Sequence, residues 1–168
     1  MPASRSELEI RPVRPGEEPL LLDLIRELAD YERMADEVEA TPALLHAALF
    51  GDRPSAEAVI AAWHREPAGF ALFFQNFSTF VGVPGLYLED LYVREPVRGN
   101  GIGKALLLHV ARLAARRGCG RMEWSVLDWN EPAIEFYHRL GARPMDDWTV
   151  FRLDRAGLRH LAGNGPAD

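Results

Sequence analysis

The most concentrated chemical signal in the chain is the stretch VRGNGIGKALLLHV at residues 97–110, where cations and alternating glycines open an apolar helical run. A helix start presents unpaired backbone N–H groups and a partial positive charge, so cations are normally disfavoured there. Arg98 and Lys104 are explained if a polyanion such as a pyrophosphate binds, with the glycines letting it reach the main chain. A glycine-rich turn that only permits tight packing of strand and helix is the alternative.

Two other phosphate motifs also place glycines before a helix, and neither fits these residues. A P-loop would need a glycine where Arg98 stands and a serine or threonine where Ala105 stands. The dinucleotide fingerprint would need its last glycine where Lys104 or Leu106 stands. The pattern that remains is Arg-x-x-Gly-x-Gly, shortly after an alternating run that ends at Val93.

A second chemical feature is the pair of adjacent acids Glu89 and Asp90 in LYLEDLYV, residues 86–93. Strict alternation would place the two carboxylates on opposite faces of a strand that is otherwise apolar or tyrosine. Charges at such positions are costly unless they serve a purpose, and a carboxylate can accept the proton of an ammonium of pKa ~10.4. The alternative is an edge strand whose acids discourage aggregation.

Tyr137 and Cys119 are the other candidate reactive side chains. Tyr137 shares helical spacing with Ala133, Ile134 and Leu140, so the spacing alone favours a core tyrosine with a satisfied hydroxyl. Cys119 lies between two glycines with no histidine nearby in sequence, which favours a structural cysteine over an acyl-enzyme nucleophile. The histidines show no metal-binding spacing, so no metal is expected.

Hydrophobic periodicity and turn residues predict the elements that position these groups. Helices are expected at residues 16–32, 42–50, 101–117, 131–140 and 155–161, with Thr41, Asn130 and Asp154 as N-caps and Gly141 ending the fourth. Strands are expected at residues 8–13, 56–64, 69–77, 85–93, 120–127 and 148–154, with a turn at residues 65–69. The order predicts an α/β fold with a mixed, mostly antiparallel sheet flanked by helices, in a single domain over residues 1–168 with a frayed tail at 163–168.

Composition narrows the class of protein. The 168 residues are 48% hydrophobic and 26% charged, which is typical of one globular domain. A net charge of -6 would repel a nucleic-acid backbone. Residues 1–12 lack the apolar core of a signal peptide, and no apolar run approaches the roughly 20 residues that a bilayer helix needs. We therefore expect a cytoplasmic protein with no nucleic-acid or membrane partner.

Two longer stretches carry a family resemblance: YLEDLYVREPVRGNGIGKALL at residues 87–107 and LDWNEPAIEFYHRLGA at residues 127–142. Together with IRELADYERM near the start, they resemble the GCN5-related N-acetyltransferase (GNAT) superfamily, in the branch of the spermidine/spermine and thialysine acetyltransferases. The resemblance implies splayed central strands, acetyl-CoA as co-substrate, direct transfer in a ternary complex and a homodimer.

The resemblance also assigns roles to residues. The cofactor arm would pair with the backbone of Leu91, Tyr92 and Val93 and meet Asn130, and its sulfur would lie beside Tyr137 as the acid. The pyrophosphate would lie on Arg98, Gly99, Asn100, Gly101, Ile102, Gly103 and Lys104. The amine would be held by Tyr31, Glu32, Glu89, Asp90, Glu123, Trp124 and Ser125, with Glu89 as the base.

The sequence is compatible with several amines as the substrate. The polyamine enzymes of this branch carry Asp-Pro-Trp where this chain has Ser78-Thr79-Phe80, while VLDWN at residues 126–130 is similar to the thialysine enzymes. The resemblance therefore implies a small cationic amine, amino-acid-like or a di- or polyamine. The alternatives are acetylation of a protein lysine or N-terminus, and a non-catalytic acyl-CoA sensor that would not require Glu89 and Tyr137.

Overall fold

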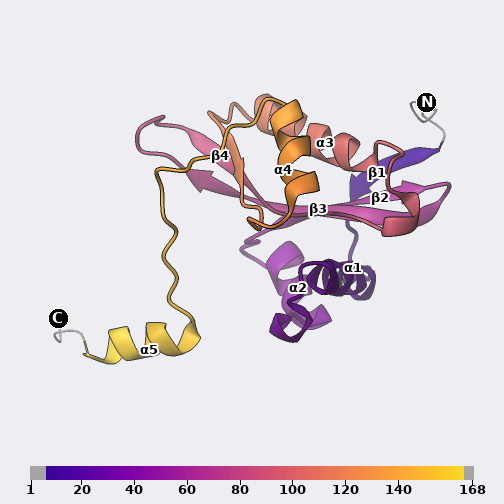
Figure 1. Cartoon of the computed structure of the whole chain (residues 1–168). Helices are drawn as coiled ribbons and strands as arrows, with labels where there is room; N and C mark the ends of the chain where they lie inside the picture. The colour runs from indigo at the N-terminus through magenta and orange to yellow at the C-terminus, as the bar shows by residue number, and fades with distance from the viewer. Residues whose placement is uncertain (1–6, 165–168) are drawn as a thin grey trace. The chain divides into compact units, whose positions relative to one another are not determined.

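The computed structural model describes residues 7–164, which form two compact units that meet in sequence between Leu127 and Asp128. The first unit contains a five-stranded sheet in the order β1-β2-β3-β4-β5 (Figure 1). The strands are β1 (Leu8–Pro12), β2 (Glu57–Trp63), β3 (Glu66–Phe77), β4 (Pro84–Val93) and β5 (Met122–Trp124). The first four are antiparallel and β5 runs parallel to β4, which confirms the predicted mixed sheet.

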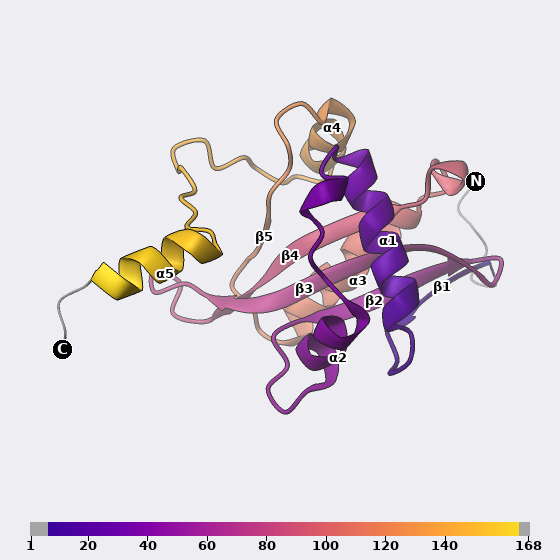
Figure 2. The same cartoon turned by 90° about the horizontal axis from the view of Figure 1, so that it is seen from below.

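Helices cover both faces of this sheet. Helices α1 (Glu18–Tyr31) and α2 (Pro42–Phe50) lie on one face and α3 (Ile102–Arg116) on the other (Figures 1 and 2). Two 3₁₀ turns, η1 (Ala35–Glu37) and η2 (Glu95–Val97), follow α1 and β4. The buried cluster below the sheet joins α1 and α2 to the strands and includes Leu21, Leu24, Leu28, Leu45, Ile60, Phe70 and Tyr92. On α3, Ile102, Leu106 and Val110 are fully buried and Leu113 is half-buried.

The turn between β2 and β3 is shorter than the predicted one at residues 65–69. His64 and Arg65 alone form it, with φ angles of 49° and 72°, as in a two-residue hairpin turn. Residues 66–69 belong to β3 because Ala68 is accommodated as an extra residue between the pairs Ala61–Gly69 and Ala62–Pro67. Pro67, which lies within the predicted turn, is therefore part of β3 and pairs with Ala62.

Strand β5 is also shorter than the predicted strand at residues 120–127. It pairs with β4 only from Leu86–Met122 to Leu88–Trp124, and Ser125 lies outside it. Within the described part of this unit, the second half of β4 has no strand on the β5 side. The pairing of β4 with β5 therefore ends at Leu88 and Trp124, which leaves the second half of β4 as an edge of the described sheet.

The second unit contains two helices, α4 (Glu131–Arg139) and α5 (Arg155–Asn164). Asn130 accepts a hydrogen bond from the Ala133 amide at 3.4 Å, and Asp154 accepts one from the Gly157 amide at 2.7 Å, so both predicted caps are confirmed. Gly141 has the positive φ expected after α4, 86°.

One prediction for the end of the chain is wrong, and another is tested only over its first two residues. The predicted strand at residues 148–154 is wrong, because no strand in the described part of the second unit offers it a hydrogen-bonding partner. Of the predicted frayed tail at 163–168, residues 163–164 belong to α5 and residues 165–168 lie outside the described residues.

Replacing Leu106 by alanine should destabilise the fold by about 3 kcal/mol, because its side chain is fully buried between α3 and the sheet and a cavity would remain. Urea unfolding would measure the loss. The matched control is Leu108→Ala on the same helix, where the side chain is 36% exposed and a loss under about 1 kcal/mol is expected. Equal losses at both positions would contradict the packing described for α3.

Candidate active site

The turn before α3 has the form that an anion site requires. Gly99 and Gly101 have φ angles of 83° and 77°, a left-handed conformation that residues with a side chain adopt at a cost. Gly101 is the N-cap of α3 and no side chain caps this end; the first intrahelical bond runs from Ala105 to Gly101 at 3.0 Å. The amides of Ile102, Gly103 and Lys104 are therefore left at an open, partially positive helix start.

Arg98, the predicted phosphate-binding cation, folds back toward β4 and α1. Its Nε donates a hydrogen bond to the Val93 carbonyl at 2.8 Å. Its guanidinium carbon lies 4.7 Å from the ring centroid of Tyr31 and 5.6 Å from that of Tyr92. Asn100 donates a hydrogen bond from its side chain to the Val97 carbonyl at 2.9 Å, which braces the same turn. The turn and its arginine are thus held in place by several elements of the first unit.

The predicted cofactor-arm strand is the half of β4 that leaves β5. Leu91, Tyr92 and Val93 pair with β3 on one side, at Ala71, Phe70 and Gly69. On the other side, the described part of the unit offers them no strand, so this edge can receive a ligand that forms strand-like hydrogen bonds. The edge leads directly into the segment that carries Arg98 and the α3 start.

A β-bulge changes the predicted arrangement of Glu89 and Asp90. Leu88 pairs with Phe73 and Asp90 with Leu72, so Glu89 is the extra residue on β4. The prediction that strict alternation sends the two carboxylates to opposite faces is therefore wrong, since a bulge redirects side chains locally. Glu32 and Asp90 line the same cavity, and Glu89 is the neighbour of Asp90 in β4, so the three carboxylates lie near one another.

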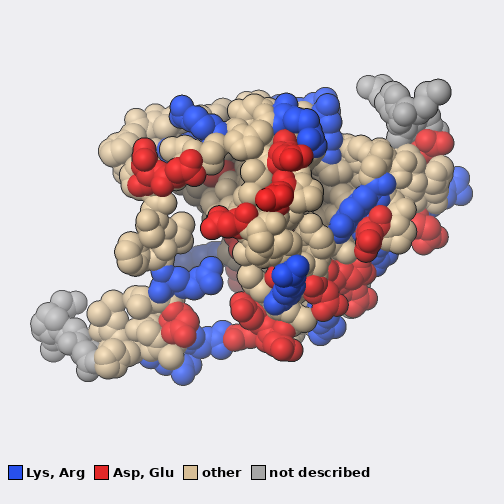
Figure 3. Space-filling model, in the orientation of Figure 1, with Lys and Arg blue, Asp and Glu red and all other residues tan. Residues whose placement is uncertain are grey.

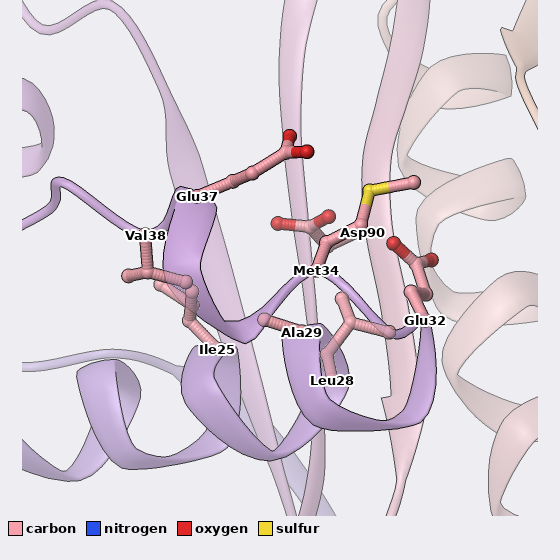
Figure 4. A pocket seen from close by; sticks show the side chains of 8 residues that line it. All are labelled: Ile25, Leu28, Ala29, Glu32, Met34, Glu37, Val38 and Asp90. Atoms are coloured by element: carbon pink, nitrogen blue, oxygen red, sulfur yellow. The ribbon is translucent and has the colours of Figure 1, made fainter.

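A small cavity adjoins two of these carboxylates. It has a volume of about 160 Å³ and lies between the end of α1, the η1 turn and β4 (Figure 4). Its lining combines apolar side chains with three acids, and consists of Ile25, Leu28, Ala29, Glu32, Met34, Glu37, Val38 and Asp90. Figure 3 shows acidic side chains gathered over the same α1 and α2 side of the molecule. This chemistry suits an aliphatic group that carries positive charge.

Sequence reasoning missed Met34 and Glu37 as lining residues of this cavity. Both lie in the irregular segment after α1, where no periodicity indicates which side chains turn inward. The signal that could have found them is the excess of acids around Glu32, in a stretch too polar to belong to the core.

Two carboxylates of the cavity, Asp90 and Glu32, are harder to ionise than ordinary acids. Burial, followed by the charges of Glu89 and Glu32, raises the pKa of Asp90 from 3.8 to about 7. Burial and the charge of Glu89 also raise the pKa of Glu32. A cation that entered the cavity would favour the ionised carboxylates and lower these pKa values again.

The β5 residues assigned to the amine lie next to the first half of β4. Trp124 pairs with Leu88, directly before Glu89. Glu123 forms an ion pair with Arg121 at 3.1 Å, and the Ser125 hydroxyl is hydrogen-bonded to the Tyr87 hydroxyl at 2.8 Å. Glu123 and Ser125 therefore have partners of their own, and Trp124 is held in the sheet next to Leu88.

Asn130 and Tyr137 belong to the second unit, so their predicted roles at the cofactor stay predictions. Asn130 is the N-cap of α4, and Tyr137 lies on the same helix with its ring 5.4 Å from that of Phe136. Among residues 7–164, no group of three or more His, Cys, Asp or Glu side chains is arranged to hold a metal ion. No helix in the described part of the chain is long and apolar enough to cross a bilayer.

An open strand edge that leads to a glycine-led helix start is the arrangement expected of an acyltransferase. The model of the Acetyltransferase (GNAT) family matches residues 21–142, and the chain belongs to this family. The protein is therefore an N-acetyltransferase enzyme of the GNAT fold.

Individual relatives agree with this family. The chain is 36% identical over 165 residues to a thialysine N-epsilon-acetyltransferase of Bos taurus, covering 92% of this chain and 96% of that protein. It is 46% identical over 94 residues to an L-ornithine N5-acetyltransferase of Arabidopsis thaliana, covering 56% of this chain and 41% of that protein. Among solved structures, an integron cassette protein from the mobile metagenome of V. cholerae aligns with a TM-score of 0.78 at 28% identity, covering 93% of this chain and 98% of that one.

Replacing Asp90 by asparagine should stabilise the protein more at alkaline than at mildly acidic pH. The pKa of Asp90 is about 7 in the folded chain against an ordinary 3.8, so the unfolded chain releases this proton first. The stability that the group contributes is full below about pH 4 and is lost as the pH rises to about 7. Between about pH 5 and about pH 8.5, the free energy of unfolding of the wild type should therefore fall by on the order of 2 kcal/mol. Asp90→Asn should not show this fall.

Urea unfolding of both proteins at the two pH values measures this difference. Asp36→Asn is the matched control, because Asp36 is an exposed acid of η1 that does not line the cavity. The control should keep the pH dependence of the wild type. The same pH dependence in Asp90→Asn would show that Asp90 ionises normally.

Proposed function

We propose that this enzyme transfers the acetyl group of acetyl-CoA to a primary amine of a small cationic substrate, by direct transfer in a ternary complex. The observation that supports it most is the gathering of Glu32, Glu89 and Asp90 beside the open edge of β4. An ammonium drawn to these carboxylates would lie next to the strand that, in this proposal, receives the cofactor arm. Bound acetyl-CoA supplies an acetyl thioester.

The proposed cofactor residues follow the exposed main chain. The backbone of Leu91, Tyr92 and Val93 would hold the arm of the cofactor. The open amides of Ile102, Gly103 and Lys104, with the side chain of Arg98, would hold its pyrophosphate. Gly99, Asn100 and Gly101 give the turn its shape, and Asn130 would meet the cofactor arm. No metal is proposed, because each of these contacts uses protein groups alone.

Each proton has a proposed carrier. An aliphatic ammonium has a pKa near 10.4, so it must lose a proton before it can attack, and Glu89 is the proposed acceptor, directly or through water. Asp90 and Glu32, with Trp124, would hold the cation. Tyr137 would give a proton to the departing thiolate; since a phenol of pKa ~10 is the weaker acid, solvent must replace that proton promptly.

A covalent acyl-enzyme is not proposed. Cys119 is half-buried in the turn between α3 and β5, and its amide is hydrogen-bonded to the Ala114 carbonyl at 3.0 Å. Arg117, two residues before Cys119, directs its guanidinium to the Glu57 carboxylate through two hydrogen bonds of 2.7 Å. Glu89 and Tyr137 would have no task in a non-catalytic acyl-CoA sensor, which favours an enzyme.

The substrate class rests on the cavity and on the relatives. Thialysine and ornithine, named for two relatives, both carry an amino group on a short aliphatic chain. The apolar and acidic cavity suits such a chain, and it would suit a di- or polyamine equally. A protein lysine is the second candidate. We also propose a cytoplasmic homodimer in which residues 1–168 act as one domain, with no nucleic-acid or membrane partner.

Release of CoA in the presence of acetyl-CoA tests the proposal against thialysine, lysine, ornithine, spermidine, short diamines and a lysine peptide. Turnover of at least one small amine, well above that of the peptide, is expected. Turnover of the peptide alone would instead support acetylation of proteins. CoA binding without turnover of any amine would support the sensor.

Tyr137→Phe should lower kcat by about 10- to 100-fold and leave the Kd for CoA unchanged, because only the proton donor is removed. Rapid-mixing kinetics and calorimetry measure the two quantities. His138→Gln, at the exposed neighbouring position, is the control and should retain wild-type turnover. A wild-type rate in Tyr137→Phe would remove the tyrosine from the mechanism.

Glu89→Gln should lower kcat/KM by about 10- to 100-fold at neutral pH and less at high pH, where the free amine is already abundant. Asp90→Asn should remove an inflection near pH 7 from the same profile, because the pKa of Asp90 is about 7 in the free enzyme. Glu95→Gln, an exposed acid outside the site, should leave the profile unchanged. Superimposable profiles for all three variants and wild type would rule out the assigned proton carriers.

A further inference from the structure

The aromatic ring of Tyr31 lies against Arg98, a contact that its predicted role in the amine site does not explain. The guanidinium carbon of Arg98 is 4.7 Å from the ring centroid, within the range of a cation–π interaction. Tyr31 is the last residue of α1, whereas Arg98 lies 67 positions later, before α3. The contact therefore joins the helix beside the amine cavity to the proposed phosphate turn.

The end of α1 is fixed to the sheet one helical turn before Tyr31. Glu27 forms a two-pronged ion pair with Arg94, at 3.0 Å from Nε and 2.8 Å from Nη2. Arg94 also donates from Nη1 to the Pro67 carbonyl at 2.9 Å. Because residues four apart share a helix face, Glu27 and Tyr31 face β4 and its extension together. The ring of Tyr31 is thereby held at a set distance from the main chain of β4.

The second ring beside Arg98 is part of β4 itself. Tyr92 is 9% exposed and its centroid lies 5.6 Å from the guanidinium carbon. Burial, and then the charge of Glu27, raises the pKa of Tyr92, so the phenol stays neutral and its ring remains an uncharged neighbour of Arg98. Arg98 is thus held by two rings, one on α1 and one on β4.

This placement keeps the hydrogen-bonding edge of Arg98 available. A guanidinium has five N–H donors, and ring contacts use its face and not its edge. The hydrogen bond from Nε to the Val93 carbonyl occupies one donor and sets the group at the end of the open β4 edge. The remaining donors lie on the two terminal nitrogens, where a phosphate can be bound by two parallel bonds.

We propose that Tyr31 is a positioning residue for Arg98, which it holds ready for the pyrophosphate of the cofactor. This inference rests on the proposed cofactor site, since Arg98 must bind the pyrophosphate for its position to matter. A long side chain that is already oriented loses less freedom when the anion binds, so the affinity for the anion is higher. Tyr31 acts in this way through Arg98 and not through contact with the amine.

The test compares donors with and without a pyrophosphate. Tyr31→Leu should raise the Kd for CoA about fivefold, and Tyr31→Phe, which keeps the ring, should restore it to within about twofold of wild type. S-acetylpantetheine lacks the pyrophosphate, so its KM should be the same in all three proteins. The KM for the best amine should also change by less than about twofold. Asp30→Asn, an exposed neighbour on α1, is the control, and thermal unfolding shows whether each variant folds.

A double-mutant cycle separates this inference from the proposed function. Arg98→Ala should weaken CoA binding, and Tyr31→Leu should then cause no further loss in that background. Additive losses, a tighter CoA complex in Tyr31→Leu, or a change confined to the amine KM would overturn the role of Tyr31 and leave the phosphate turn intact. An Arg98→Ala variant with wild-type affinity for CoA would overturn the proposed phosphate turn, and the inference with it.

Discussion

The pairing of β4 with β5 ends at Leu88, and the arrangement of the candidate site depends on that early separation. Backbone N–H and C=O groups need partners, and a sheet normally supplies them across its whole width. Here the second half of β4 is paired on the β3 side, while the described part of the first unit offers no strand on the other. An open strand edge suits a ligand that forms strand-like hydrogen bonds, and the arm of the co-substrate is proposed to take that place.

The same strand brings charge to the site at a cost in stability. A bulge inserts Glu89 into β4, and partial burial, followed by repulsion from neighbouring carboxylates, opposes ionisation of Asp90 and Glu32. A core of this size would be more stable with apolar residues there. Acids that are hard to ionise in the free protein become favourable partners once a cation arrives, so the unfavourable electrostatics are consistent with a site for an ammonium.

Features determined by neighbouring residues were predicted well from the sequence. The caps at Thr41, Asn130 and Asp154 bind amides three residues ahead, and Gly99 and Gly101 adopt the left-handed conformation that the glycine pattern indicated. Features that depend on a partner strand were predicted less well. Three features depend on which backbone groups pair between strands: the hairpin at His64 and Arg65, the length of β5, and the strand wrongly predicted at residues 148–154. The periodicity of a single segment does not predict its pairing partners.

The sequence by itself determined the family, the order of the elements and the residue types of the phosphate turn, because helix starts, glycine conformations and apolar periodicity are local properties. Only the tertiary structure decided that Glu89 forms a bulge, that Glu37 and Met34 line the cavity, and that Arg98 lies against Tyr31. Each of these joins segments far apart in the chain or depends on a neighbouring strand. Their geometry depends on how α1, η1 and β4 pack together. The spacing of residues within one segment does not predict that packing.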